Sequence, residues 1–208
     1  MPITVTTPRG LGRLSTPLRT LVAAVVRGEG RRLEEVAVVL ADDELLHRIN
    51  AEWRGHDYAT DVISFAYDEH EADAATRPLR GDLLISVDRV FVQAARYRVT
   101  PGAELARLVI HGALHLCGHD HMRKGERARM RTREEAALRK AKPAVRAFDA
   151  VLATARPAAP RPATRRRKAA PRGSARPKAT APKAKASSRR PARTGPARRA
   201  RDAASRAR

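Results

Sequence analysis

The fold and the chemistry of this chain follow from one stretch, residues 111–121, which reads His111-Gly112-Ala113-Leu114-His115-Leu116-Cys117-Gly118-His119-Asp120-His121. Residues four apart lie on the same face of an α-helix, so His111 and His115 can reach one metal ion. Gly118 can adopt the left-handed conformation that ends a helix, which lets the chain turn back and present His121. Three protein ligands that leave a fourth position open are typical of a catalytic zinc ion, and we predict one Zn2+ per chain.

The residue after the first histidine indicates which reaction the zinc ion assists. In zinc peptidases with this spacing that residue is Glu, which takes a proton from the attacking water and passes it to the leaving amine. Here it is Gly112. Zinc alone lowers the pKa of a bound water to about 7. Because the alkoxide released from a phosphodiester depends less on a proton relay than an amine does, the motif favours phosphodiester hydrolysis over amide hydrolysis.

The other polar residues of the stretch allow more than one interpretation. His119 is a fourth imidazole beside the site and an alternative ligand. Asp120 can orient a ligating imidazole, or it can simply solvate the end of the helix. Cys117 lies about 120° from the ligand stripe, because it is six positions after His111, and we interpret it as a packing residue.

Two more blocks accompany the histidine stretch, in residues 50–65 (NAEWRGHDYATDVISF) and in residues 81–86 (GDLLIS). In this order, the three blocks resemble the signature of the YbeY family of bacterial metal-dependent endoribonucleases. The resemblance spans roughly residues 1–150. One departure is His119, at a position where the family commonly has Tyr.

The resemblance implies a fold, an activity and a substrate. The fold would be α+β, with a small four-stranded, mostly parallel mixed sheet, about five helices and a zincin-like arrangement around the metal helix. The activity would be zinc-dependent endonucleolytic cleavage of single-stranded RNA. The substrate would be ribosomal RNA, in maturation of the 3′ end of small-subunit rRNA and in ribosome quality control, so the ribosomal small subunit is an expected partner.

Outside the histidines, Arg54 is the residue to which we assign a catalytic role. Its planar guanidinium suits bidentate contact with a phosphate and stays charged at any working pH, and the family's functional Arg falls at this position. Thr60, Asp61 and Ser64 are candidate substrate-binding residues, better suited to shape a strand edge than to perform chemistry. Ser64 has no base partner visible in the sequence that would make it a nucleophile. Asp82 is either a turn residue or a positioning group.

Two other functions stay open from the sequence alone. A peptidase, or another small-substrate hydrolase with a zincin-like site, would need a Glu supplied from elsewhere in the fold. A non-catalytic ribosome assembly factor would hold a structural metal ion, with His119 or Asp120 closing the fourth coordination position.

Charge divides the chain into two parts. The whole chain has a formal net charge of +21, but residues 156–208 hold nineteen Lys and Arg and a single acid, Asp202, which leaves +3 for the rest. No Val, Ile, Leu, Met or aromatic residue follows Leu152, so the basic segment cannot bury a core. We predict a folded domain over residues 1–150 and a disordered Ala, Pro, Arg and Lys tail over residues 151–208. The tail is either a non-specific RNA contact or a dispensable solvated extension.

The sequence gives no sign of export or membrane insertion. A single cysteine cannot form an internal disulfide, so nothing indicates an oxidising compartment. No secretory signal is recognisable, and the early apolar run at residues 21–26 is far shorter than the roughly 18–20 residues of a membrane span. A cytoplasmic location is expected.

Hydrophobic periodicity predicts the order of the elements. Strands are expected at residues 3–6, 36–40, 62–66 and 83–87, and helices at residues 17–28, 42–53, 88–98 and 124–140 and from Pro101 through the histidines. Thr16 and Asp88 are expected N-caps, and Trp53 is expected on an apolar helix face. Residues 68–80 are expected to form a loop. Strands and helices intermix without a clean βαβ alternation, which favours an α+β fold.

Overall fold

The computed structural model describes residues 2–67, 78–121 and 123–155. Within these ranges the chain forms, in order, β1 (Ile3–Thr6), a 3-10 turn (Gly12–Leu14), α1 (Ser15–Gly28), β2 (Leu33–Ala41), α2 (Asp43–Arg54), β3 (Val62–Ala66), β4 (Leu79–Ser86), α3 (Val87–Tyr97), α4 (Pro101–Leu116), α5 (Lys124–Lys140) and α6 (Lys142–Leu152). Residues 68–77 of the predicted loop and the basic segment from residue 156 lie outside the described residues. The end of the loop prediction is wrong, because Leu79 and Arg80 already belong to β4. The division near residue 150 stays a prediction.

The four strands form one mixed sheet in the order β1-β2-β4-β3. β1, β2 and β4 are parallel, whereas β3 runs antiparallel to β4, with Ser64 opposite Leu83. This confirms the α+β fold with a small, mostly parallel sheet. Because alternate residues of a strand face opposite sides, β3 shows Ile63 and Phe65 to one face of the sheet and Val62, Ser64 and Ala66 to the other.

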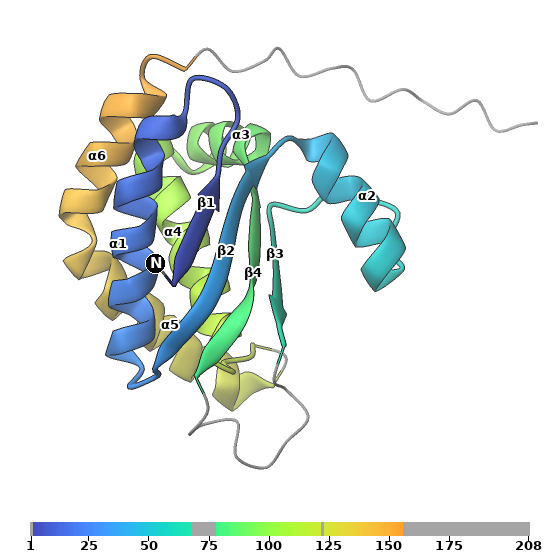
Figure 1. Cartoon of the computed structure of the whole chain (residues 1–208), viewed down its shortest axis with the longest axis vertical. Coiled ribbons are helices and arrows are strands. Elements are labelled where there is room, and N and C mark those ends of the chain that lie inside the picture. The colour runs from blue at the N-terminus through green and yellow to red at the C-terminus, as the bar shows by residue number, and fades with distance from the viewer. Residues whose placement is uncertain (1, 68–77, 122, 156–208) are drawn as a thin grey trace, which may run out of the picture. The chain divides into compact units, whose positions relative to one another are not determined.

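Helices cover the two faces of the sheet unequally. α1, α4, α5 and α6 lie on one face, and α2 lies on the opposite face (Figure 1). The main core fills the first face, where Leu18, Val38, Leu108 and Phe148 are completely buried. The α2 face has a small second core of Ala41, Leu46, Ile63 and Leu84. The metal helix α4 is therefore held in the larger core, and α2 is held by few apolar contacts.

The helix α6 was not expected from the sequence, so the described residues contain six α-helices rather than about five. It follows α5 after the single residue Ala141, and Pro143 lies in its first turn, where a missing N–H does no harm. Its residues Phe148, Val151 and Leu152 are buried. α6 thus packs against α4 and α1. Among the helices of the described ranges, none combines the length and the apolarity that a membrane span requires.

Two predicted caps are wrong. α1 begins at Ser15, before Thr16, because the 3-10 turn at Gly12–Leu14 leads directly into it. The N-cap of α3 is Ser86, whose hydroxyl accepts a hydrogen bond from the Arg89 N–H at 3.1 Å. Asp88 instead accepts from the Asp43 N–H at 3.0 Å, which joins the beginnings of α2 and α3.

Candidate metal centre and substrate cleft

The helix α4 places His111 and His115 on the one side of it that faces away from the core. Thr100 caps the helix through a hydrogen bond from the Ala103 N–H at 3.2 Å, and Pro101 opens it, as expected. Its other side is buried through the residues that the sequence predicted, which are Leu105, Leu108, Val109 and Leu114. The two histidines are therefore fixed to a rigid, buried element.

Gly112, which stands where zinc peptidases have Glu, lies close to the sheet. A Cβ atom at this residue would lie 2.2 Å from Cδ1 of Leu83 and 3.1 Å from Cγ2 of Val62. A larger residue here would therefore require the buried Leu83 side chain to move. Glycine at this position fits the close packing of α4 against β3 and β4.

The turn after α4 returns the chain to the two histidines. Gly118 has a φ of 90°, in the left-handed region. Its N–H donates to the His115 carbonyl at 2.9 Å, and the His119 N–H donates to the Leu114 carbonyl at 3.0 Å. These bonds satisfy the last carbonyls of the helix and reverse the chain. Cys117 packs against the main core, where burial raises its pKa to about 11, in keeping with a packing role.

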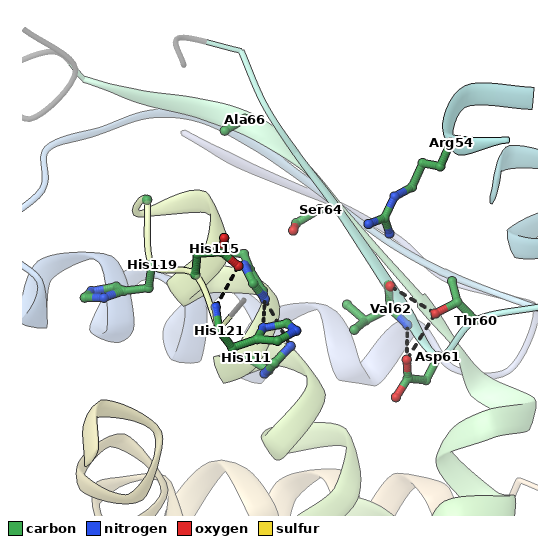
Figure 2. A pocket seen from close by; sticks show the side chains of 12 residues that line it. Arg54, Thr60, Asp61, Val62, Ser64, Ala66, His111, His115, His119 and His121 are labelled. Atoms are coloured by element: carbon green, nitrogen blue, oxygen red, sulfur yellow. Dashed lines mark hydrogen bonds between the residues drawn. The ribbon is translucent and has the colours of Figure 1, made fainter. Parts of the chain in front are cut away.

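Three imidazole nitrogens converge at this turn (Figure 2). Nε2 of His115 lies 3.2 Å from Nε2 of His111 and 3.1 Å from Nδ1 of His121. Nitrogen atoms about 2.0–2.1 Å from a tetrahedral zinc ion are about 3.3 Å apart, so the spacing fits one ion. Burial and the neighbouring His111 and His121 lower the pKa of His115 to about 4, which leaves its lone pair available at neutral pH.

A carboxylate from α5, which was not predicted from the sequence, supports the first histidine. Oε1 of Glu134 lies 2.5 Å from Nδ1 of His111. Burial alone would raise the pKa of Glu134, but its hydrogen bond to His111 and the charges of His111, Arg107 and His115 lower it overall. An ionised carboxylate at Nδ1 keeps the proton on that nitrogen and leaves Nε2 for the ion.

His119 and Asp120 form hydrogen bonds within the protein and are not part of the group of candidate metal ligands. Nε2 of His119 lies 2.9 Å from the Glu29 carboxylate, which also lies 3.6 Å from the Arg133 guanidinium. The Asp120 carboxylate accepts a hydrogen bond from the His121 N–H at 2.6 Å. In the part of the chain that the structure describes, the group able to hold a metal ion consists of His111, His115 and His121.

The three histidines form one wall of a cleft of about 560 Å³, and β3 with the end of α2 forms the other. Arg54, the last residue of α2, points into the cleft toward Val62 and Ser64 (Figure 2). The left-handed Gly55 ends the helix there. Asn50 fixes the following loop, because its carbonyl accepts from the His56 N–H at 3.1 Å and its amide donates to the Tyr58 carbonyl at 2.9 Å.

The other candidate residues shape the cleft at the start of β3. The Thr60 hydroxyl donates to the Asp61 carboxylate at 3.3 Å, and the same carboxylate oxygen accepts from the Val62 N–H at 3.0 Å. Ser64 faces the cleft. Asp82 is not a turn residue, because it lies inside β4. Its carboxylate accepts a hydrogen bond from the Tyr67 hydroxyl, a contact that raises the pKa of Tyr67 to about 12.

Known proteins are similar to this chain in sequence and in fold. A family model described as Endoribonuclease YbeY matches residues 13–142. Endoribonuclease YbeY of Chloroflexus aurantiacus is 48% identical over 106 residues, which cover 49% of this chain and 69% of the relative. Endoribonuclease YbeY of an Anaeromyxobacter species is 42% identical over 134 residues, covering 64% and 67%. The solution structure of TM1509 from Thermotoga maritima matches with a TM-score of 0.51 at 25% identity, covering 69% of this chain and 91% of that one. This chain belongs to the YbeY endoribonuclease family.

Proposed function

We propose that this chain is a zinc-dependent endoribonuclease that cleaves single-stranded RNA, with His111, His115 and His121 as the ligands of the ion. One observation carries the proposal: three convergent histidine nitrogens face an exposed guanidinium, that of Arg54, across one open cleft. Membership of the family supports the endoribonuclease activity. The preference for single strands and the role in small-subunit rRNA maturation and ribosome quality control follow from the family resemblance set out above.

Hydrolysis forms a bond from a water oxygen to phosphorus and breaks one bond from phosphorus to a ribose oxygen, which leaves with a proton. When bound, zinc supplies Lewis acidity to the attacking water and to a phosphate oxygen. Arg54 binds two phosphate oxygens through its planar guanidinium, which offsets the charge that develops on them. Glu134 holds the His111 ring in one orientation. Thr60 and Asp61 fix the beginning of β3, from which Ser64 faces the substrate.

The two alternative functions find less support in the geometry. A peptidase needs a carboxylate base on the open side of the ion, but Glu134 bonds to the outer nitrogen of His111. The cleft-lining carboxylates, Asp61 and Asp120, accept hydrogen bonds from the backbone. A structural metal needs a fourth protein ligand, and the imidazole of His119 is directed to Glu29.

The proposal is tested by metal content and RNA cleavage in one preparation. The purified protein is expected to carry about one zinc ion per chain, to cut a single-stranded RNA and to leave the matched duplex intact. A chelator should abolish cleavage, and added zinc should restore it. His115→Ala, purified identically, controls for contaminating ribonucleases. Cleavage that persists after the metal content has fallen to zero contradicts the proposal.

A further inference from the structure

The cleft continues past the metal centre. A second hollow, of about 480 Å³, has Asp61, Val62, His111 and His121 in its lining, and all four also line the first cleft. Arg54 belongs to the first hollow, whereas Gln93, Tyr97, Val99 and Arg107 belong to the second. The candidate ligands thus lie between two connected hollows. An enzyme that cuts within a strand must accommodate nucleotides on both sides of the scissile phosphate. The candidate substrate residues predicted from the sequence, Arg54, Thr60, Asp61 and Ser64, all line the first hollow.

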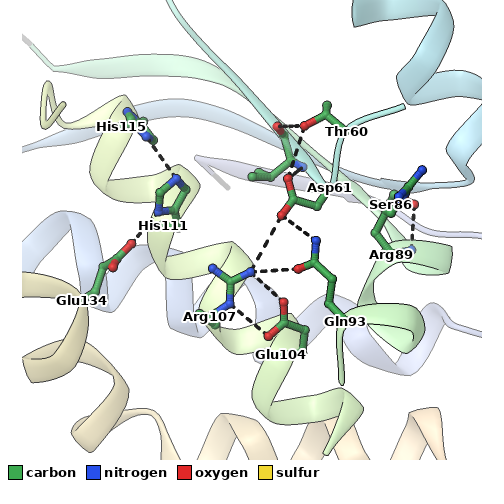
Figure 3. Close-up of polar contacts among 11 residues, drawn as sticks. Thr60, Asp61, Ser86, Arg89, Gln93, Glu104, Arg107, His111, His115 and Glu134 are labelled. Carbon is green, nitrogen blue, oxygen red and sulfur yellow. Dashed lines mark hydrogen bonds and ion pairs between the residues drawn. The ribbon is translucent and has the colours of Figure 1, made fainter. Parts of the chain in front are cut away.

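The floor of the second hollow is a fixed hydrogen-bond network (Figure 3). Arg107 donates to the Glu104 carboxylate at 2.6 and 3.0 Å and to the Gln93 side-chain carbonyl at 3.0 Å. The Gln93 amide in turn donates to Asp61 at 3.0 Å. Glu104 is only 1% exposed, so its charge is matched inside the protein by Arg107. The network joins α3 and α4 to Asp61, the residue before β3, and holds these lining side chains in place.

The chemistry of this floor suits a nucleobase better than a phosphate. Arg107 is paired with Glu104 and lies 3.8 Å from Asp61, so its charge is already balanced by two carboxylates. The residues that remain in the lining are apolar or neutral, apart from the histidines shared with the metal centre. A flat, neutral, hydrogen-bonding group is therefore favoured over a second anion.

The aromatic residue of this hollow is Tyr97, the last residue of α3. Tyr97 is 54% exposed, although a large aromatic residue ordinarily buries much of its surface. The Arg96 guanidinium lies 5.8 Å from the centre of its ring, and Arg98, which ends the helix, has a left-handed φ of 57°. The sequence around the ring is thus Arg96-Tyr97-Arg98, an aromatic ring between two cations. Exposed rings beside cations are the usual stacking platforms for bases of single strands.

We propose that the second hollow binds the nucleotide on the side of the scissile phosphate away from Arg54, with its base stacked on the ring of Tyr97. This inference rests on the proposed cleavage of single-stranded RNA and extends it, because it names the residue that holds the strand beyond the metal centre. Tyr97 touches the base and no reacting atom, so it is a binding residue.

The test asks whether removing the Tyr97 ring and removing one base of the RNA abolish the same contact. A short single-stranded RNA is cut by the wild-type protein and the cleavage position is mapped; abasic nucleotides are then placed one at a time around it. We expect one abasic position, on one side of the cut, to lower kcat/KM by roughly 5- to 100-fold. Tyr97→Ala should lose a similar factor with the intact RNA and lose nothing more with that abasic RNA, because the two changes remove the same contact.

Two control variants accompany Tyr97→Ala. Tyr97→Phe should keep the wild-type rate, because it keeps the ring. Val92→Ala, also on α3 and 53% exposed but outside the hollow, should behave as wild type. The inference is overturned if Tyr97→Ala cuts the intact RNA at the wild-type rate, or if its loss adds in full to that of every abasic position. The Kd of each RNA is measured in parallel by fluorescence anisotropy. A wild-type protein that binds but does not cut would therefore contradict the proposed function, while the Kd values still decide the role of Tyr97.

Discussion

The two walls of the cleft are built in opposite ways. The histidine wall belongs to α4, whose apolar side is fully buried in the main core, and Glu134 holds the ring of His111 from outside. The Arg54 wall belongs to the end of α2, which contacts the sheet through a four-residue core, and Trp53 beside it is 71% exposed. Elements with few buried contacts open more easily. The histidine wall is thus held rigidly, and if Arg54 binds a phosphate as proposed, we expect the Arg54 wall to be the one that adjusts to the substrate.

The largest effect is expected from removing a candidate metal ligand from the histidine wall. His115 lies between His111 and His121, within 3.2 Å of a nitrogen of each. His115→Ala should lose the metal ion and lower RNA cleavage by more than about 100-fold, because even residues that only orient a ligand cost about 10- to 100-fold. Metal content by atomic spectroscopy and kcat/KM on a single-stranded RNA measure the two effects.

The matched control for this variant is His119→Ala. His119 is in the same turn, but its imidazole contacts Glu29. Metal content and cleavage should stay near the wild-type values. Loss of the metal in His119→Ala with retention in His115→Ala or His121→Ala would show that the ligand set is wrong.

A smaller change to the same wall is Glu134→Gln. The amide has nearly the shape of the carboxylate but lacks its charge, so it no longer favours the proton on Nδ1 of His111. We expect metal affinity to fall by about 10- to 100-fold, measured by competition with a chelating dye. Glu135→Gln is the control, because the neighbouring Glu135 pairs with Arg131 at 3.0 Å on the exposed side of α5. Equal affinities in both variants would remove Glu134 from the metal centre.

The Arg54 wall is tested by Arg54→Lys. Lysine keeps the charge but loses the planar pair of donors. We expect kcat/KM for RNA to fall by roughly 10-fold, the value of one strong charged hydrogen bond, with metal content unchanged. Arg48→Lys, an exposed arginine of the same helix that does not line the cleft, should have no effect. A wild-type rate in Arg54→Lys would make Arg54 an ordinary surface residue.

The histidine wall was also the more predictable of the two walls from the sequence. His111, His115, Gly118 and His121 are close in the chain; helix geometry relates the first two, and the left-handed turn at Gly118 brings His121 beside them. The apolar side of α4 and the strands Ile3–Thr6 and Val62–Ala66 were predicted for the same reason, since each pattern repeats within a few residues. Where the structure depends on spacing within one element, the sequence carries the information.

The features that the sequence did not reveal depend on contacts between distant elements. Glu134 reaches His111 across 23 positions, and Gln93 meets Asp61 across 32. Nothing in the local pattern distinguishes these residues from solvated ones. Trp53 was placed on a buried face because its spacing is helical, but it is exposed, and its ring lies edge-to-face with that of Phe65 at a ring-centre distance of 6.5 Å. The small second core thus does not extend to the end of α2 that carries Trp53.

The last prediction concerns the basic segment, which the sequence alone describes. Residues 156–208 carry +18 of the +21 formal charge, so most non-specific affinity for RNA should come from them. Each phosphate neutralised on a single strand contributes roughly −0.7 to the slope of log affinity against log salt concentration. Deleting the segment should weaken RNA binding at low salt and flatten that slope, while metal content and kcat at saturating RNA change little, because the candidate ligands and Arg54 all precede residue 122. Anisotropy titrations at several salt concentrations measure the slope. An unchanged slope would mean that the two walls and the floor of the cleft supply the binding themselves, and that the basic segment is a solvated extension.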